Sequence, residues 1–217
     1  MAVIAYLDMT SPTADRLVAA YATDEDRAAA DERRTAASRN QRLCVRALLR
    51  SLLAEHEPES AGWRLLRDED GAPRLQARGG AVTPFCSLSH SGDMVACGLA
   101  RIGRIGIDIE RIRIGRRILA ISQAAFGPAE RAAVEFGGAE TFYRVWTLRE
   151  ALAKASGAGS GLLVDRVDEI PVLSDIRPAD QSPYRFRYWR LPEHYGLGVA
   201  LACPPAEMAD LTPIGLS

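Results

Sequence analysis

The sequence predicts an α+β fold, built either as one large domain or as two small lobes, and three observations carry this prediction. The chain has 217 residues, 47% of them hydrophobic and 25% charged, which is enough for either arrangement. Stretches with helical spacing of apolar residues alternate with short strand-like runs joined by polar turns. Residues 91–100 (SGDMVACGLA) and 195–205 (YGLGVALACPP) share a glycine turn followed by a small apolar strand. This repeat is consistent with a duplicated α/β half but does not establish one.

The expected elements follow from these patterns in chain order. Residues 24–55 predict one or two helices, because the apolar side chains of VRALLRSLLAEH recur at helical spacing. We expect more than one helix over residues 115–136, since Gly127 and Pro128 can end one helix and start the next. Residues 138–156 give the clearest helical pattern, which GAGSGLL closes. RDEDGAPRL predicts a charged turn, and the expected strands are residues 2–7, 83–90, 94–100, 104–112, 184–191 and 196–205.

The composition restricts the partners and the compartment. A net charge of −1 gives no overall basic field for nucleic acid. No apolar run approaches the ~20 residues of a membrane span, and the N-terminal MAVIAYLDMT lacks the basic leader of a signal peptide. The four cysteines form no CxxC pair, so we expect them to be reduced and buried. We therefore expect a cytoplasmic protein that binds neither nucleic acid nor membrane.

Local charge is less even than the net charge. Six arginines lie between residues 33 and 50 with no acidic residue among them. Such a stripe can bind phosphate, although most are solvated helix faces. Lys154 is the only lysine of the chain, which gives it weight in any motif that contains it.

The strand GIDIE places two carboxylates on one face. Side chains alternate across a strand, so Asp108 and Glu110 share one face and the isoleucines share the other. Two like charges so close repel each other, and a hard divalent cation with oxygen ligands relieves the repulsion. Spacing alone favours a half-buried strand with a solvated acidic face over a metal site.

The helix at residues 138–156 carries a second set of charged residues. Trp146, Glu150 and Lys154 follow one another at intervals of four beside an apolar stripe, so they share a face. Taken alone, Glu150 and Lys154 fit a stabilising surface pair. Trp146 on the same face indicates that it is partly covered, and a covered carboxylate requires a cation.

A third candidate is SLSHSGD, where His90 precedes a serine-glycine turn. The chain has no GxSxG motif, which argues against a hydrolase triad. A histidine flanked by hydroxyls can bind phosphate, and a hydrogen-bonded turn histidine is the alternative.

These segments together resemble a known family. GIDIE and, about forty residues later, WTLREALAKASGAG resemble the signature pair of the 4'-phosphopantetheinyl transferases, roughly G-[IV]-D-[IVL]-E and W-[ST]-x-[KR]-E-[AS]-x-x-K-x-x-G-x-G. GAPRL, FCSLSHSGDMVACGLA and VRALLRSLLA are similar to segments that precede these in the family. The matching stretches lie between residues 33 and 165. The fixed motif positions present here are Gly106, Asp108, Glu110, Trp146, Glu150, Lys154, Gly157 and Gly159.

In its length of 217 residues, the chain resembles the two-lobed, surfactin-synthetase-activating type of this family. That resemblance implies a pseudo-dimer of two similar α/β lobes, residues 1–102 and 103–217. Each lobe would be a small, mostly antiparallel sheet packed with helices. The active site would lie between the lobes, and the chain would work as a monomer.

The resemblance also implies a reaction and its site. The 4'-phosphopantetheine arm would pass from coenzyme A to a serine of an apo acyl or peptidyl carrier protein, releasing adenosine 3',5'-bisphosphate. The pathway would be fatty-acid, polyketide or nonribosomal peptide synthesis. Asp108, Glu110 and Glu150 would hold Mg²⁺, or Mn²⁺ in its place. Glu150 would also accept the serine proton, directly or through water, and Lys154 would bind pyrophosphate. Ser89 and His90 would contact the nucleotide's 3'-phosphate.

Two positions depart from the family pattern. Ala72 replaces the lysine of a G-K-P motif that helps bind the coenzyme's phosphates, and Arg74 could substitute for it. Ala37 stands where an N-terminal basic residue is expected, so Arg34 and Arg39 become the candidates.

Two other functions remain open from the residues alone. A metal-dependent phosphodiesterase would use the same three carboxylates. A non-catalytic carrier-protein-binding module would keep the fold, although intact metal and lysine positions argue against it.

Overall fold

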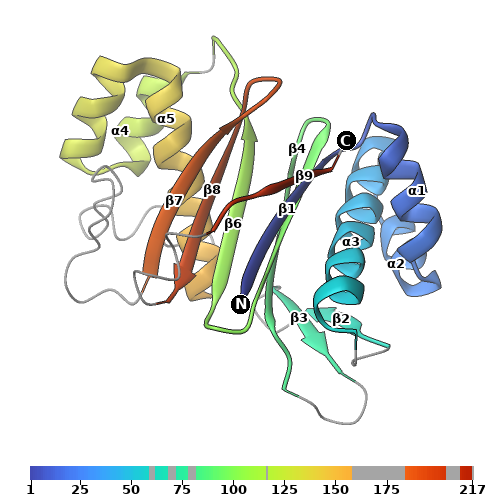
Figure 1. The fold of residues 1–217 in the computed structure, drawn as a ribbon. Coiled ribbons are helices and arrows are strands. Elements are labelled where there is room, and N and C mark those ends of the chain that lie inside the picture. Colours follow the sequence, from blue (N-terminus) through green and yellow to red (C-terminus); the bar gives the residue numbers. More distant parts are fainter. Residues whose placement is uncertain are drawn as a thin grey trace. The chain divides into compact units, whose positions relative to one another are not determined.

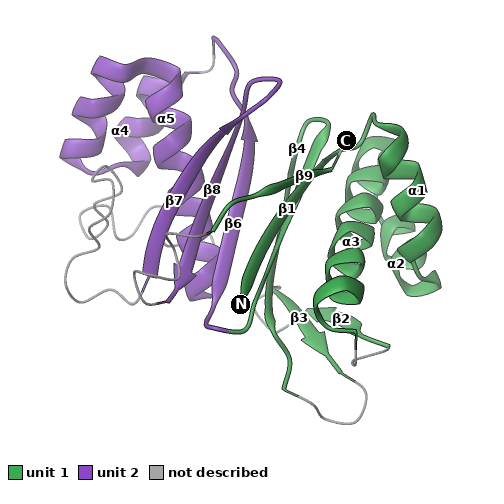
Figure 2. Cartoon of the chain, viewed as in Figure 1, with its two compact units in different colours: residues 1–101, 211–217 green, residues 102–210 purple. Residues whose placement is uncertain are grey.

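The computed structural model describes residues 1–58, 62–67, 72–77, 82–115, 117–157, 184–203 and 211–216. The chain divides into two compact units: Met1–Arg101 with Leu211–Ser217, and Ile102–Asp210 (Figure 2). Residues 211–217 therefore belong to the first unit, whereas the sequence-based division assigned them to the C-terminal lobe. The described residues are α+β, as the sequence predicts.

Unit 1 is a mostly antiparallel sheet packed with helices (Figure 1). Its sheet has the strand order β4-β5-β1-β9, in which only the β1–β9 pair is parallel. Helix α3 packs on this sheet, and α1 and α2 pack on α3. A small hairpin, β2-β3, completes the unit. The elements are β1 (Ala2–Asp8), α1 (Pro12–Tyr21), α2 (Asp24–Asp31), α3 (Ala36–His56), β2 (Arg64–Arg67), β3 (Pro73–Gln76), β4 (Phe85–Ser91), β5 (Met94–Ala100) and β9 (Ile214–Leu216).

Local sequence explains where the helices of unit 1 begin. Thr23 and Thr35 each form a capping box, with Asp26 and Ser38 respectively, which satisfies amide groups at the starts of α2 and α3. The expected helical region 24–55 is thus two helices. The β4–β5 hairpin turns through Gly92, whose φ of 56° favours glycine.

Unit 2 is a three-stranded antiparallel sheet of order β6-β8-β7 with a long helix, α5, packed on all three strands. Helix α4 packs against α5 (Figure 1). Strands β5 and β8 lie in the two sequence segments that share a pattern, residues 91–100 and 195–205. Each is a buried strand with neighbouring strands on both edges. The elements are β6 (Ile105–Arg111), α4 (Ile118–Ala125), α5 (Pro128–Ser156), β7 (Tyr184–Leu191) and β8 (Tyr195–Ala202).

Glycine and proline divide the helical region of unit 2. Helix α4 ends before Gly127, and Pro128 opens α5, which confirms the predicted break. A second break occurs inside α5 at Gly138, where φ is 63° and ψ is −144°. Helix α5 ends at Gly157, whose φ of 73° is the left-handed conformation of a helix C-terminus. The rest of GAGSGLL lies outside the described residues.

All four cysteines are free and buried, as predicted. Among the described residues, no helix is long and apolar enough to cross a membrane.

Candidate functional site

The close approach of β6 and α5 depends on glycine. A Cβ atom on Gly106 would lie 1.9 Å from the carbonyl oxygen of Ala151 and 2.6 Å from the amide of Ala155. Gly198 on β8 faces α5 in the same way, since its Cβ would lie 2.9 Å from Thr147. The helix backbone therefore rests directly on the sheet. Because side chains alternate on a strand, Asp108 and Glu110 share the face of Gly106 and are directed toward the helix side.

Lys154 and Asp108 form the central contact between these two elements. The Nζ atom of Lys154 donates to Oδ1 of Asp108 at 2.7 Å and to the carbonyl oxygen of Ile107 at 2.9 Å. Asp108 is only 7% exposed, and the Lys154 side chain is about one-third exposed at 32%. The lysine that the sequence offers as a surface partner of Glu150 is thus bound to the neighbouring strand.

Glu150 is half-buried on the same side of α5, and the charges of Asp108 and Lys154 shift the pKa of its carboxyl. Burial raises the pKa of its carboxyl, the negative charge of Asp108 raises it further, Lys154 opposes the rise, and Glu110 adds to it. The negative charges of Asp108 and Glu110 therefore both act on the carboxyl of Glu150.

The three carboxylates are chemically suited to a hard divalent cation, since Mg²⁺ prefers carboxylate oxygens. A cation would also relieve the repulsion between carboxylates that contributes to the raised pKa of Glu150. The carboxylate oxygens of these residues do not form a complete metal site in this structure. In the described part of the chain, no three His, Cys, Asp or Glu side chains are close enough to hold a metal ion. Lys154 occupies one oxygen of Asp108 instead.

Trp146 covers the other end of this helix face. Its ring stacks on Phe142 at 5.9 Å between centroids and lies 6.4 Å from Phe126. The expected coverage of this face is confirmed, because Trp146 packs against a buried aromatic cluster. The neighbouring apolar stripe is buried as well, and comprises Val145, Leu148, Leu152 and Ala155.

Sequence reasoning missed a buried ion pair beside Glu150. Arg149 is fully buried and binds Glu130, which is 3% exposed, at 2.5 Å between Nη2 and Oε2. Arg149 fills the [KR] position of the family motif, but helical spacing gave no signal for its burial, because an arginine in a helix ordinarily faces solvent.

The remaining predicted residues lie in unit 1. Ser89 and His90 are neighbours on β4, where Ser89 is buried and His90 exposed. Arg74 is an exposed residue of β3. Arg34 is exposed just before α3, and Arg39 is exposed on its first turn and donates to the carbonyl oxygen of Arg33 at 2.9 Å.

The arginine stripe divides into structural and less constrained members. Arg46 and Arg50 both bind the buried carboxylate of Asp26, so they hold α2 against α3.

Arg42 has a different environment. Burial lowers the pKa of its guanidinium, and the positive charges of Arg67, Arg33 and Arg46 lower it further, against the opposing charge of Glu32. Within the described residues, its Nε has no hydrogen-bond partner. Arg42 is therefore a positive group that an anion would stabilise.

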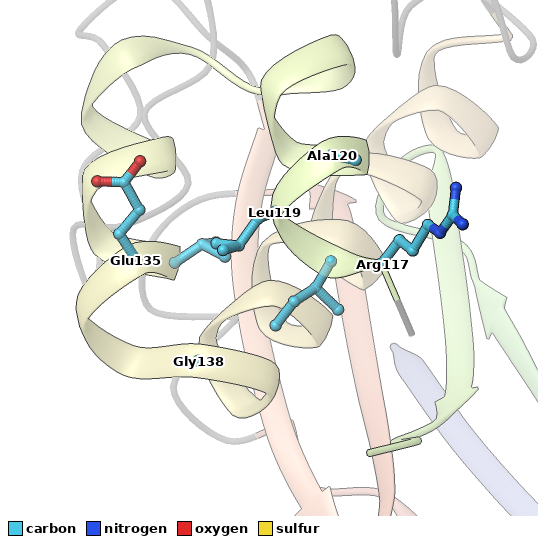
Figure 3. A pocket seen from close by; sticks show the side chains of 7 residues that line it. Arg117, Leu119, Ala120, Glu135 and Gly138 are labelled. Atoms are coloured by element: carbon cyan, nitrogen blue, oxygen red, sulfur yellow. The ribbon is translucent and has the colours of Figure 1, made fainter. Parts of the chain in front are cut away.

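A separate hollow lies in unit 2 between α4 and the first half of α5 (Figure 3). Its volume is about 480 Å³, and none of the predicted site residues lines it. The lining residues are Arg117, Ile118, Leu119, Ala120, Val134, Glu135 and Gly138.

Comparison with known proteins points to the same region. Residues 104–200 match the sequence model of the 4'-phosphopantetheinyl transferase superfamily. The chain is 36% identical over 107 residues to the 4'-phosphopantetheinyl transferase AcpT of Salmonella typhimurium, covering 48% of this chain and 54% of that protein. It is 29% identical over 140 residues to the 4'-phosphopantetheinyl transferase HetI of Nostoc, covering 62% of this chain and 57% of that protein.

A third relative is the 4'-phosphopantetheinyl transferase of Bacillus subtilis, with 29% identity over 126 residues, 54% of this chain and 55% of the relative. The chain spans about half the length of the curated relatives that it matches. The matched residues 104–200 contain β6, α5 and the charged cluster between them. Over these residues the chain is similar to the 4'-phosphopantetheinyl transferase superfamily.

Proposed function

We propose that the protein transfers the 4'-phosphopantetheine arm of coenzyme A to a serine of an apo acyl or peptidyl carrier protein. The observation that carries this proposal is the cluster of Asp108, Glu150 and Lys154, which spans β6 and α5 inside the region that matches the superfamily. The serine oxygen attacks the phosphorus that bears the pantetheine arm. The bond from that phosphorus to the bridging oxygen of the pyrophosphate breaks, and adenosine 3',5'-bisphosphate leaves.

Asp108, Glu110 and Glu150 would hold Mg²⁺, or Mn²⁺, together with pyrophosphate oxygens. When bound, the ion would neutralise the pyrophosphate and polarise the phosphorus under attack. Lys154 already lies against Asp108, so a phosphate oxygen could exchange for the carboxylate as its partner. Such an exchange would free an oxygen of Asp108 for the cation.

Glu150 is our candidate for the group that accepts the serine proton, directly or through a water. A carboxyl with a raised pKa is a stronger base than an ordinary one once it is ionised. Its position beside Asp108 would place that base at the pyrophosphate.

Residues of unit 1 would bind the nucleotide end of coenzyme A. Ser89 and His90 are candidates for the 3'-phosphate, and Arg74, Arg34 and Arg39 for the other phosphates. We add Arg42, because its positive neighbours and half-buried position favour an anionic partner. We also propose that the two units are the two lobes of a monomeric enzyme.

The decisive experiment incubates the protein with coenzyme A, Mg²⁺ and purified apo carrier proteins of the acyl and peptidyl kinds. Mass spectrometry should show one phosphopantetheine added to a carrier. If no carrier of either kind gains this mass, the proposed transfer is wrong. A parallel incubation with a nitrophenyl phosphodiester tests the phosphodiesterase alternative, which predicts release of nitrophenol without any carrier.

A further inference from the structure

The buried pair of Glu130 and Arg149 joins the first turn of α5 to the turn that carries Glu150. Oε2 of Glu130 accepts from the amide of Gly127 at 3.0 Å, in the position of an N-terminal cap. The same carboxylate accepts from Arg149, at 3.0 Å from Nε and 2.5 Å from Nη2. One buried carboxylate thus bonds to two points of the chain that are more than twenty residues apart.

This connection spans a break in the helix. Gly138 has non-helical backbone angles, so the hydrogen-bond ladder of residues 128–137 does not continue into residues 139–156. The direction of the second half is consequently set by its tertiary contacts, which include its packing on β6 and β8. Arg149 supplies one of them, since its guanidinium also lies 5.5 Å from the ring centre of Phe126.

The position of Arg149 in the chain gives this contact a consequence for the site. Consecutive residues of an α-helix differ by roughly 100° about the axis, so anchoring Arg149 toward Glu130 determines where Glu150 points. Glu150 in turn must lie near Asp108 and Lys154 for the three groups to act together.

We propose that Glu130 is a positioning residue, which acts through Arg149 to hold the turn bearing Glu150 against β6. This inference rests on the proposed function where it concerns turnover, but the positioning itself is a property of the protein without substrate. It extends the site beyond the residues of the signature motifs to the first turn of α5.

The test replaces both charges at once, with Glu130→Met/Arg149→Met. Replacing a buried ion pair with apolar side chains of similar volume is often tolerated, whereas removing one partner leaves an uncompensated charge. The matched control is Glu140→Gln/Arg190→Gln, which removes an exposed pair that links the same helix to β7. Both variants are compared with the wild type for melting temperature, for amide hydrogen exchange and for transfer.

If the pair positions the turn, the Met variant melts near the wild-type temperature but exchanges faster at residues 146–154. Its kcat falls about tenfold or more, while its KM for coenzyme A stays within about twofold. The Gln control matches the wild type in all three measurements. A folded Met variant with wild-type exchange and wild-type kcat would overturn the proposal.

Two further measurements keep the outcome decisive. If the Met variant does not fold, Arg149→Lys keeps the charge but loses the forked contact, and it should show faster exchange at residues 146–154 and a lower kcat. Wild-type values for this variant would also overturn the proposal. If the wild type itself transfers nothing, the proposed function fails, and the exchange comparison still decides whether Glu130 and Arg149 hold the turn.

Discussion

Asp108 is the residue on which the proposed site most directly depends. It is buried, it accepts a hydrogen bond from Lys154, and its negative charge raises the pKa of Glu150. Asp108→Ala should abolish transfer, because it removes a proposed metal ligand. The fold should persist, since Lys154 is about one-third exposed and can turn toward water. Transfer measured by mass spectrometry, with circular dichroism as the control for folding, checks this. Unchanged turnover would contradict the metal assignment.

Arg42 is the residue that the structure adds to the proposed coenzyme site. Arg42→Ala should raise the KM for coenzyme A several-fold with little change in kcat, because a lost phosphate contact weakens substrate and transition state equally. Arg16→Ala, an exposed arginine on α1, is the matched control and should leave the KM unchanged.

The partner of Arg42 can be identified with dephospho-coenzyme A, which lacks the 3'-phosphate. If Arg42 binds the 3'-phosphate, wild type and Arg42→Ala should have similar KM values for this substrate. A KM difference as large as that for coenzyme A itself would place Arg42 at the pyrophosphate instead.

Sequence reasoning reached some of these residues and not others for physical reasons. Strand and helix periodicity pair Asp108 with Glu110 and Glu150 with Lys154. The resemblance to the family's signature motifs joined the two pairs into one site. The bond between Lys154 and Asp108 could not be predicted, because it depends on how closely β6 approaches α5. Arg149 was missed because burial of its charge requires Glu130, nineteen positions earlier in the chain.

At the scale of elements, α2 and α3 are held together by one buried carboxylate. Asp26 is fully buried, and burial by itself would raise its pKa, but the hydrogen bonds from Arg50 and Arg46 outweigh that effect and hold the pKa below its usual value. A carboxyl with a lowered folded-state pKa stabilises the protein above its ordinary pKa, and this stabilisation disappears as the pH falls through the folded-state value.

Asp26→Asn should therefore destabilise the protein by about 3–5 kcal/mol near neutral pH, because two arginines lose their buried partner. The difference in unfolding free energy between variant and wild type should shrink as the pH falls below the ordinary pKa of 3.8. Urea unfolding at several pH values measures both quantities. A difference that is constant from pH 7 to pH 2 would contradict the ion-pair explanation.

The contact between β6 and α5 gives a second prediction at this scale. Gly106→Ala should destabilise the protein by roughly 1–3 kcal/mol, because the added Cβ overlaps the carbonyl oxygen of Ala151 and must push the helix away. Transfer should fall even in the folded fraction, since Glu150 and Lys154 move with the helix. Thermal unfolding and turnover per folded molecule check the two effects separately, and wild-type turnover would show that this spacing is not needed.

The elements themselves were predictable where the pattern was long or the break had a chemical signal. β6, the helix at 138–156 and the break at Gly127 and Pro128 are confirmed. Helix α1 and strands β2, β3 and β9 were not predicted. RDEDGAPRL was expected to be a turn, but its last residues, 73–75, belong to β3. β9 has three residues and exists through its parallel pairing with β1, which no local pattern reveals.

For the whole molecule, the α+β class is confirmed, and each unit packs a long helix on a mainly antiparallel sheet. The last seven residues belong to unit 1 because β9 pairs with β1, so the chain leaves unit 2 before it ends. The similar places of β5 and β8 in their sheets support, as a proposal, the duplication that the repeated sequence suggests.

The proposal of a monomeric enzyme with its site built from both units can be tested by mixing variants. Asp108→Ala alters unit 2 and His90→Ala alters unit 1, and we expect each to transfer poorly by itself. If one chain supplies the whole site, a mixture of the two variants stays as inactive as its components, because no chain has both residues. If two chains share a site, mixing restores up to about a quarter to a half of wild-type turnover, since some assembled sites combine an intact Asp108 with an intact His90. Recovered activity that rises with protein concentration would contradict the monomer and assign the site to an interface between chains.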